Sequence, residues 1–226
     1  MSTRAWVACL VLAAGAVAAT AGQGVHPVTG RRIAPVMSHL GADWLDRPER
    51  AREEAPDRAL DALAIRPGQA VADVGAGSGY FTERLARRVG PEGRVYAVDI
   101  QPEMLERLEA RVKRAGLSNV TPLLGAEADP RLPPACCDLI LMVDVYHELA
   151  RPQEMLRRLG AALANDGRLV LLEYRKEDPD IPIRPEHKMS VADARAELEA
   201  EGFRLERVID VLPRQHVLVF GLATAR

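Results

Sequence analysis

Cysteine is scarce in this sequence, which has three cysteines in 226 residues. Cys136 and Cys137 are neighbours, and a bridge between adjacent cysteines is strained. Cys9 lies far from them, inside an uncharged run near the N-terminus. No framework of distant cysteine pairs exists, so disulfides are not expected to hold this fold together. The cysteines also provide too few ligands at close range for a structural zinc site.

Aromatic residues and an excess of one charge are lacking too. Aromatics make up 4% of the chain, and 30 Lys and Arg residues nearly balance 32 Asp and Glu residues. Proteins that bind single-stranded nucleic acid stack the bases on aromatic side chains, and nucleic-acid binders in general carry a basic field. We therefore expect no nucleic-acid partner.

One long uncharged run is present, from Ala5 to Ala21. It is rich in Ala, Val and Leu, ends in small residues, and is short for a bilayer span of about 20 residues. We interpret residues 1–21 as a secretory signal peptide or an N-terminal anchor. A signal peptide would export the protein to the periplasm or out of the cell, and an anchor would associate it with a membrane. If the run is an anchor, Arg31 and Arg32 favour the alternative of a cytoplasmic body.

The length and composition of the chain indicate one domain behind an arm. With 226 residues and 48% hydrophobic content, the chain can bury one sizeable core. Residues 22–56 are rich in Pro, Gly and Arg and show little periodicity, which predicts an extended N-terminal arm that passes into a short helix. Regular patterning follows, so we place the folded domain at residues 57–226.

Strand and helix patterns alternate along this domain. Apolar runs predict seven strands, at residues 70–74, 94–99, 120–124, within 138–145, and at 168–174, 203–211 and 216–222. Helical spacing predicts a short helix before the first strand and longer helices at residues 80–89, 102–116, 153–164 and 190–201. Such alternation indicates an α/β fold with a mostly parallel sheet covered on both faces. Ligands on these sheets bind at the carboxyl ends of the strands, near the switch in strand order.

The stretch VADVGAGSGY, residues 71–80, lies at that edge of the sheet. Gly75 and Gly77 permit backbone angles closed to other residues and let a ligand approach the main chain, while Gly79 lets the helix start close to the strand. Free N–H groups at a helix start attract a carboxylate or phosphate. Asp99 ends the second strand, where an acid can accept hydrogen bonds from two ribose hydroxyls. The pattern predicts a pocket for a nucleoside that carries an anionic group.

The glycine spacing disfavours a dinucleotide. A dinucleotide fingerprint has the form G-x-G-x-x-G, and in this chain Tyr80 stands where its third glycine belongs. The spacing here is G-x-G-x-G, with Asp73 two residues before the first glycine. A nucleotide-dependent oxidoreductase is therefore the weaker alternative.

Taken together, these features resemble the class I S-adenosylmethionine-dependent methyltransferases. The resemblance rests on DVGAGSG, on AVD at the end of the second strand, on DLILMVDV followed by YHEL, and on a final helix followed by GF and two strands. It extends from Pro56 to Leu222. It implies a Rossmann-like sheet of seven strands with helices on both faces, in which the last strand is antiparallel and inserted between the fifth and sixth. It also implies S-adenosylmethionine as the cofactor.

The resemblance assigns cofactor-binding roles to residues at the carboxyl edge. Asp73 and the glycine backbone would hold the methionine end, Asp99 the ribose hydroxyls, and Ile100 would lie against the adenine. Members of the family often place an acid after a glycine to bind the adenine amino group, and this chain has Ala126 and then Glu127 there. The implied set is Asp73, Gly75, Ala76, Gly77, Gly79, Asp99, Ile100, Ala126, Glu127 and Asp144. The last of these ends the fourth strand and would line the same cleft. For each acid the alternative is a helix cap or a surface charge.

His147 is the candidate catalytic residue, because it follows the fourth strand directly. Methyl transfer from a sulfonium depends mainly on alignment, and a base is needed only where the acceptor must lose a proton. Imidazole can take a proton near neutral pH. The alternative is that His147 bonds the cofactor or caps the next helix. A zinc hydrolase helix would need a second histidine where Arg151 stands, so no metal site is predicted.

The acceptor is expected to be a small molecule, lipid-like or phenolic. The loop IPIRPEHKMS, which contains His187, and the arm around Trp44 and Arg47 are expected to form its pocket, because loops carry specificity on such scaffolds. The simpler alternatives are a solvated His187 and a Trp44 that packs on the core. A non-catalytic module that keeps the fold and the nucleoside pocket is the alternative function.

Overall fold

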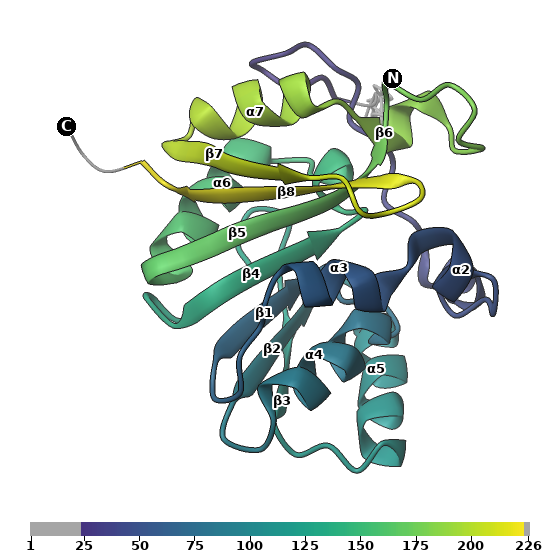
Figure 1. The fold of residues 1–226 in the computed structure, drawn as a ribbon, viewed down its shortest axis with the longest axis vertical. Helices are drawn as coiled ribbons and strands as arrows, with labels where there is room; N and C mark the ends of the chain where they lie inside the picture. The colour runs from purple at the N-terminus through teal and green to yellow at the C-terminus, as the bar shows by residue number, and fades with distance from the viewer. Residues whose placement is uncertain (1–23, 224–226) are drawn as a thin grey trace, which may run out of the picture.

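The computed structural model describes residues 24–223 (Figure 1). The predicted signal peptide or anchor at residues 1–21 lies outside the described residues. Among residues 24–223, none of the helices has the length and apolar character that a bilayer span requires.

A mixed β-sheet forms the centre of the molecule. Its strands are β1 (Ala70–Val74), β2 (Arg94–Asp99), β3 (Val120–Leu124), β4 (Cys137–Val143), β5 (Leu163–Arg175), β6 (Lys188–Met189), β7 (Phe203–Ile209) and β8 (Gln215–Leu222). The order is β3-β2-β1-β4-β5-β8-β7, and the first five strands are parallel. The last strand, β8, lies antiparallel between β5 and β7. The inserted antiparallel strand that the resemblance implies is thus confirmed.

Two features of the sheet differ from the sequence prediction. The sheet has an eighth strand, β6, whose two residues pair with the end of β5 and are too few to give a periodic signal. In addition, β5 begins at Leu163 rather than at Arg168. The stretch LANDG between them has the polar and glycine content of a loop, yet Leu163 pairs with Cys137 across an irregularity in the register.

Helices cover both faces of the sheet (Figure 1). They are α1 (Ala42–Leu45), α2 (Arg50–Glu54), α3 (Pro56–Ala62), α4 (Tyr80–Val89), α5 (Pro102–Arg114), α6 (Pro152–Ala162) and α7 (Val191–Glu199), with 3-10 turns at η1 (His39–Gly41), η2 (Tyr146–Glu148) and η3 (Pro185–His187). Alternate side chains of β4 separate the two layers. Leu139 and Leu141 pack with apolar residues of α3 and α4, whereas Ile140 and Met142 pack with those of α6 and α7.

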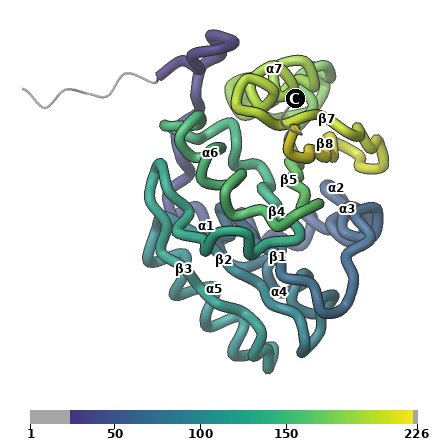
Figure 2. The backbone as a smooth tube through the Cα atoms, turned by 90° about the vertical axis from the view of Figure 1, so that its left-hand side faces the viewer, coloured from purple at the N-terminus to yellow at the C-terminus, as the bar shows by residue number. Residues whose placement is uncertain are grey.

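The N-terminal arm contains α1 and α2 and runs past α6 along the carboxyl edge of the sheet (Figure 2). Arg31 anchors one end through hydrogen bonds of 2.8, 3.0 and 3.1 Å from its guanidinium to the carboxylate of Glu197 in α7. Gln101, just after β2, donates its side-chain N–H to the carbonyl of Met37 at 2.9 Å. The arm therefore forms a wall at the edge where the ligand is expected.

Candidate functional site

A pocket of about 690 Å³ opens at the carboxyl edge of the sheet, where β1 separates β2 from β4 and the strand order reverses. Its volume lies within the range of pockets that hold small ligands. It brings together residues that are far apart in the sequence. Of the sequence-predicted cofactor residues, it is lined by Gly75, Gly77, Asp99, Ile100, Ala126, Glu127 and Asp144.

The other predicted cofactor residues lie beside this pocket. Asp73 and Ala76 line a small adjoining cavity of about 30 Å³. Gly79 is the N-cap of α4 with a φ of 83°, and a Cβ there would come within 2.9 Å of Leu108. These three residues position the glycine loop rather than form the wall of the main pocket.

The glycine loop is held by hydrogen bonds of its own. The N–H groups of Gly75 and Ala76 both donate to the carbonyl of Val98 in β2, at 2.8 and 2.9 Å. Gly75 has a φ of 77°, and a Cβ on it would lie 2.3 Å from the side chain of Val145. These two donors are occupied within the protein, and the free N–H groups on which the sequence argument relied are those at the start of α4, after Gly79. The contribution of Gly75 is therefore a bare main chain that fits under the loop after β4.

Asp99 is held so that its carboxylate faces the pocket. One carboxylate oxygen accepts the Gly77 N–H at 2.8 Å and the other accepts the Gln101 N–H at 2.9 Å. Burial raises the pKa of Asp99, and these backbone hydrogen bonds oppose the rise. Ile100 is 39% exposed and lines the same wall. A fixed carboxylate beside an exposed apolar side chain fits a ribose and the base attached to it.

Asp144 carries an unsatisfied oxygen at the pocket wall. Its Oδ2 accepts a hydrogen bond from the Gln215 side chain at 2.7 Å, while its Oδ1 is inaccessible to solvent and has no partner among the described residues. Burial raises the pKa of Asp144 well above its usual value. Buried polar atoms are normally satisfied, so Oδ1 is suited to a donor on a ligand.

Asp73 gives a pH-dependent prediction. It is buried, accepts a 2.6 Å hydrogen bond from the Thr82 hydroxyl, and burial raises its pKa to about 6. Between about pH 4 and 6 the folded carboxyl keeps its proton and the unfolded one has lost it, so the free energy of unfolding falls as pH rises, by about 2–3 kcal/mol in total. Asp73→Asn removes this titration.

The expected observation is a difference between the variant and the wild type that changes with pH. Urea unfolding from pH 4 to 8 measures the free energy of unfolding of Asp73→Asn minus that of the wild type. This difference should increase between pH 4 and 6 and stay constant above pH 6. A difference that stays constant from pH 4 to 8 would show that burial does not raise the pKa of Asp73.

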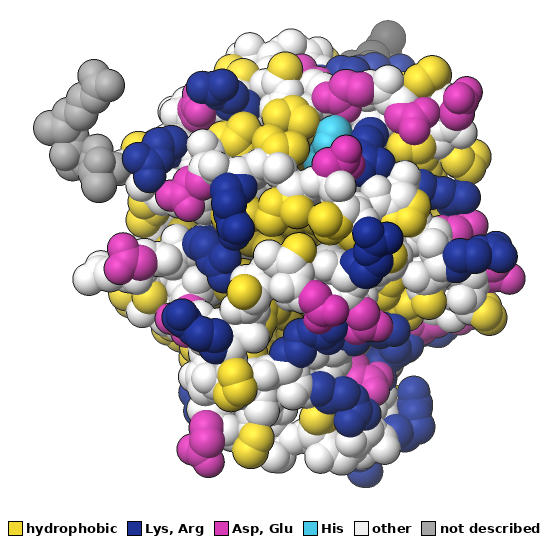
Figure 3. Space-filling model, in the orientation of Figure 1, with side chains coloured by type: hydrophobic (Ala, Val, Ile, Leu, Met, Phe, Trp, Pro, Cys, Tyr) yellow, Lys and Arg dark blue, Asp and Glu magenta, His cyan; other side chains and the backbone are white. Residues whose placement is uncertain are grey.

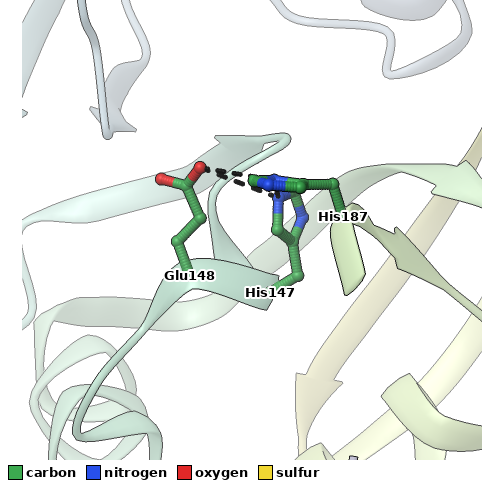
Figure 4. Close-up of side chains that lie close together, drawn as sticks. All are labelled: His147, Glu148 and His187. Atoms are coloured by element: carbon green, nitrogen blue, oxygen red, sulfur yellow. Dashed lines mark hydrogen bonds and ion pairs between the residues drawn. The ribbon is translucent and has the colours of Figure 1, made fainter. Parts of the chain in front are cut away.

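His147 lies in a chain of polar contacts in the same pocket. Its Nδ1 lies 2.6 Å from the carboxylate of Glu173 in β5, and its Nε2 lies 3.1 Å from Nδ1 of His187. Glu148 completes the group, with a carboxylate oxygen 3.9 Å from His147 and 3.7 Å from His187 (Figure 4). The backbone carbonyl of His147 also accepts the N–H of Ala34 from the arm at 3.0 Å.

The surroundings of this group shift its pKa values in different directions. Burial acts to lower the pKa of His147, but the nearby Glu173 carboxylate outweighs it and the pKa is raised. Burial and the neighbouring His147 lower the pKa of His187. Burial raises the pKa of Glu148 to about 7. A cluster of buried and half-buried titratable groups with shifted pKa values, inside a pocket, is typical of a functional site.

Two members of this group were not identified as partners of His147 from the sequence. Glu173 sits within the apolar run RLVLLEY, where a single charge among buried aliphatic residues was a signal that a partner must exist. His187 was assigned to the acceptor loop, but nothing in its spacing indicates that it contacts His147, 40 residues earlier. The parallel pairing of β4 with β5 brings Glu173 to His147, and the pairing of β5 with β6 brings the loop that carries His187 beside them.

A largely apolar part of the pocket wall comes from the arm and from the loop before β6. Its side chains include those of Val36, Met37, Trp44, Pro182 and Ile183. The predicted arm residue Arg47 is not part of it. Instead its guanidinium stacks on the Trp44 ring, 3.8 Å from the centroid, and pairs with Glu54 at 2.8 Å.

The outer surface carries both charges. On the face shown in Figure 3, Lys and Arg side chains are interspersed with Asp and Glu side chains. This agrees with the net charge of −2 for the whole chain. The expectation that no nucleic acid binds rests on this balance.

Residues 71–167 match a family model described as a methyltransferase domain. The fold is similar to the crystal structure of a SAM dependent methyltransferase from Aquifex aeolicus, with a TM-score of 0.77, 30% identity, and coverage of 82% of this chain and 98% of that one.

Curated relatives match over a shorter part. A protein-L-isoaspartate O-methyltransferase from Ignicoccus hospitalis is 37% identical over 100 residues, which are 44% of this chain and 46% of that protein. A ubiquinone/menaquinone biosynthesis C-methyltransferase from Ralstonia pickettii is 30% identical over 113 residues, covering 50% and 46%. The chain thus spans about half the length of these relatives.

Proposed function

The chain belongs to the class I S-adenosylmethionine-dependent methyltransferases, and from this membership we propose that it transfers a methyl group to a small, largely apolar acceptor. The observation that carries the proposal is that one pocket is lined by two unlike sets of residues. We assign Asp99, Gly75 and Asp144 to a cofactor half, and the apolar side chains of the arm and of the loop before β6 to an acceptor half. The names of the relatives indicate different acceptors. One relative acts on protein L-isoaspartate, and another acts in ubiquinone/menaquinone biosynthesis.

The residues of the pocket would act mainly by holding two reactants in line. When bound, S-adenosylmethionine supplies a methyl group activated by its positive sulfur. The acceptor's lone pair forms the new bond to the methyl carbon, and the electron pair of the broken carbon–sulfur bond stays on sulfur. Alignment of this kind contributes about 7–11 kcal/mol in favourable cases. The arm and the loop before β6 exclude water from the line of transfer.

A small apolar acceptor suits the apolar half of the pocket. The wall from the arm offers Met37 and Trp44, which can contact a ring or an alkyl chain. The arm is fixed across this region by its hydrogen bonds to Gln101 and Glu197. A protein acceptor would have to reach past it, so we favour a small molecule over a protein side chain.

The experiment is an assay with methyl-labelled S-adenosylmethionine and a panel of hydroxyl, thiol and carbon acceptors, with products identified by mass spectrometry. Transfer to a small acceptor is expected. Binding of the cofactor without transfer to any acceptor would instead favour a non-catalytic module, and transfer only to protein would overturn the small-molecule acceptor.

Replacement of His147 tests which half of the pocket this residue serves. We propose that it acts on the acceptor, because it lies beside His187 and Glu148 in the pocket and its two ring nitrogens contact Glu173 and His187. His147→Ala should lower kcat by at least about 100-fold, while the Kd for S-adenosylmethionine changes by less than threefold. Isothermal titration gives the affinity and also shows that the variant is folded. A loss confined to cofactor affinity would refute this role.

A further inference from the structure

The arrangement of His147, His187 and Glu148 provides three ligand atoms that converge on one point. His147 Nε2, His187 Nδ1 and a Glu148 carboxylate oxygen are separated by 3.1, 3.7 and 3.9 Å. The point equidistant from three atoms with this spacing lies about 2.1 Å from each, which is the length of a zinc–imidazole or zinc–carboxylate bond. The side chains come from η2 and η3 and point toward one another (Figure 4).

The tautomer of His147 suits a ligand role. Glu173 accepts the backbone N–H of Tyr146 at 3.0 Å through one oxygen, and its other oxygen lies 2.6 Å from His147 Nδ1. Glu173 thus acts as an acceptor for the Nδ1 proton, which leaves the lone pair of His147 on Nε2, the atom that faces His187. A carboxylate behind a histidine ring is the usual outer support of a metal-bound histidine.

The charge balance at this point also favours a cation. Glu148 is half-buried, with a side chain 14% exposed, and the ion-pair partners found for it among residues 24–223 are the two imidazoles. Glu173 is fully buried next to them. Two carboxylates beside two imidazoles give this point a negative charge, which a divalent cation would neutralise.

We propose that His147, His187 and Glu148 bind a divalent transition metal ion, with zinc the best fit. Two imidazole nitrogens and one carboxylate oxygen are ligands of zinc and its neighbours, whereas calcium and magnesium favour oxygen ligands throughout. A small displacement of the ion from the plane of the three atoms gives a tetrahedral site with its fourth position open. Three protein ligands and one open position are typical of catalytic zinc.

The open position gives the site a use in the proposed reaction, and this part rests on the proposed function. All three ligands line the pocket that also contains Gly75 and Asp99. A hydroxyl or thiol of the acceptor could occupy the fourth position, where the ion lowers its pKa and its proton passes to water. The acceptor's heteroatom then keeps the lone pair that forms the bond to the methyl carbon. The inferred acceptor class is therefore an alcohol, phenol or thiol.

The competing use of the same atoms is a direct hydrogen bond between the two imidazoles. In that case the chain from Glu173 through His147 to His187 is a proton relay without metal, and His187 faces the acceptor as its base. Both uses predict that loss of His147 lowers turnover. They differ in metal binding, which can be measured without cofactor or acceptor.

The test uses the full chain, stripped with a chelator and titrated with zinc chloride in the absence of S-adenosylmethionine. One zinc ion per chain is expected, with a Kd at or below the micromolar range. His187→Ala should weaken binding at least about 100-fold and Glu148→Gln at least about 10-fold. Glu173→Gln, which keeps the shape of the side chain behind His147, should weaken it about 10- to 100-fold.

The matched control is His39→Ala, which removes a half-buried histidine outside the pocket lining and should leave zinc affinity within twofold. Cobalt(II) in place of zinc should give the visible absorption of a tetrahedral site, and His187→Ala should remove it. The proposal is overturned if the wild type binds no zinc, or if His187→Ala and His39→Ala bind it equally. Methyl transfer by the zinc-free enzyme would support the proposed function and contradict a role for zinc in it. Zinc binding without methyl transfer to any acceptor would support the metal site and not the proposed function.

Discussion

Asp99→Ala is expected to weaken the binding of S-adenosylmethionine by about 100-fold. Asp99 is 7% exposed and held by the N–H groups of Gly77 and Gln101, so its carboxylate is fixed before the ligand arrives. We expect it to accept two ribose hydroxyls, and a hydrogen bond to a charged group contributes about 1.5–3 kcal/mol. Loss of the carboxylate also removes the hydrogen bond that the Gly77 N–H of the glycine loop donates to it.

Isothermal titration of the variant with S-adenosylmethionine measures this loss. The matched control is Glu103→Ala, which removes an acid in the first turn of the following helix, outside the pocket lining. It should bind within twofold of the wild type. If Asp99→Ala is folded by its thermal melt and binds within threefold of the wild type, the ribose assignment is wrong.

Gly75→Ala is expected to damage both stability and cofactor binding. The backbone at Gly75 has a φ of 77°, and the added Cβ would lie 2.3 Å from the side chain of Val145, closer than any real contact of this kind. The left-handed backbone costs about 1–2 kcal/mol, and overpacking costs about 1–3 kcal/mol more. The loop after β4, which carries Asp144 and His147, must shift to make room, so we expect cofactor affinity to fall at least about 10-fold.

Gly116→Ala separates the two costs. Gly116 also has a left-handed φ, of 66°, but a Cβ there meets nothing within 4 Å. The free energy of unfolding of this variant, measured in urea, should fall only by the cost of the left-handed backbone. The variant should bind the cofactor as the wild type does. Adding Val145→Ala to Gly75→Ala should restore part of the affinity. Equal stability and equal affinity for the two single variants would contradict the close approach at Gly75.

The sequence predicted the sheet and the cofactor half of the pocket well because both depend on local signals. Apolar runs with turn residues between them set the strands, and the glycines mark a turn whose φ values only glycine adopts readily. Asp99 could be assigned because it ends a strand at a fixed distance from that turn. These features are encoded over short stretches of chain, which a single sequence displays directly.

The acceptor half could not be predicted to the same depth. The contact between His147 and His187 depends on the pairing of β4 with β5 and on the path of the loop before β6. The prediction that no metal binds was drawn from the residues close to His147 in the sequence. These residues cannot reveal a ligand that comes from another loop. Long-range contacts of this kind follow from tertiary packing.

The most direct test of this account is a calorimetric titration of the purified chain with S-adenosylmethionine. We expect saturable binding of one molecule per chain, displaced by S-adenosylhomocysteine, and no heat with a nicotinamide dinucleotide. A chain that is folded but gives no binding with S-adenosylmethionine would contradict the assignment of the pocket.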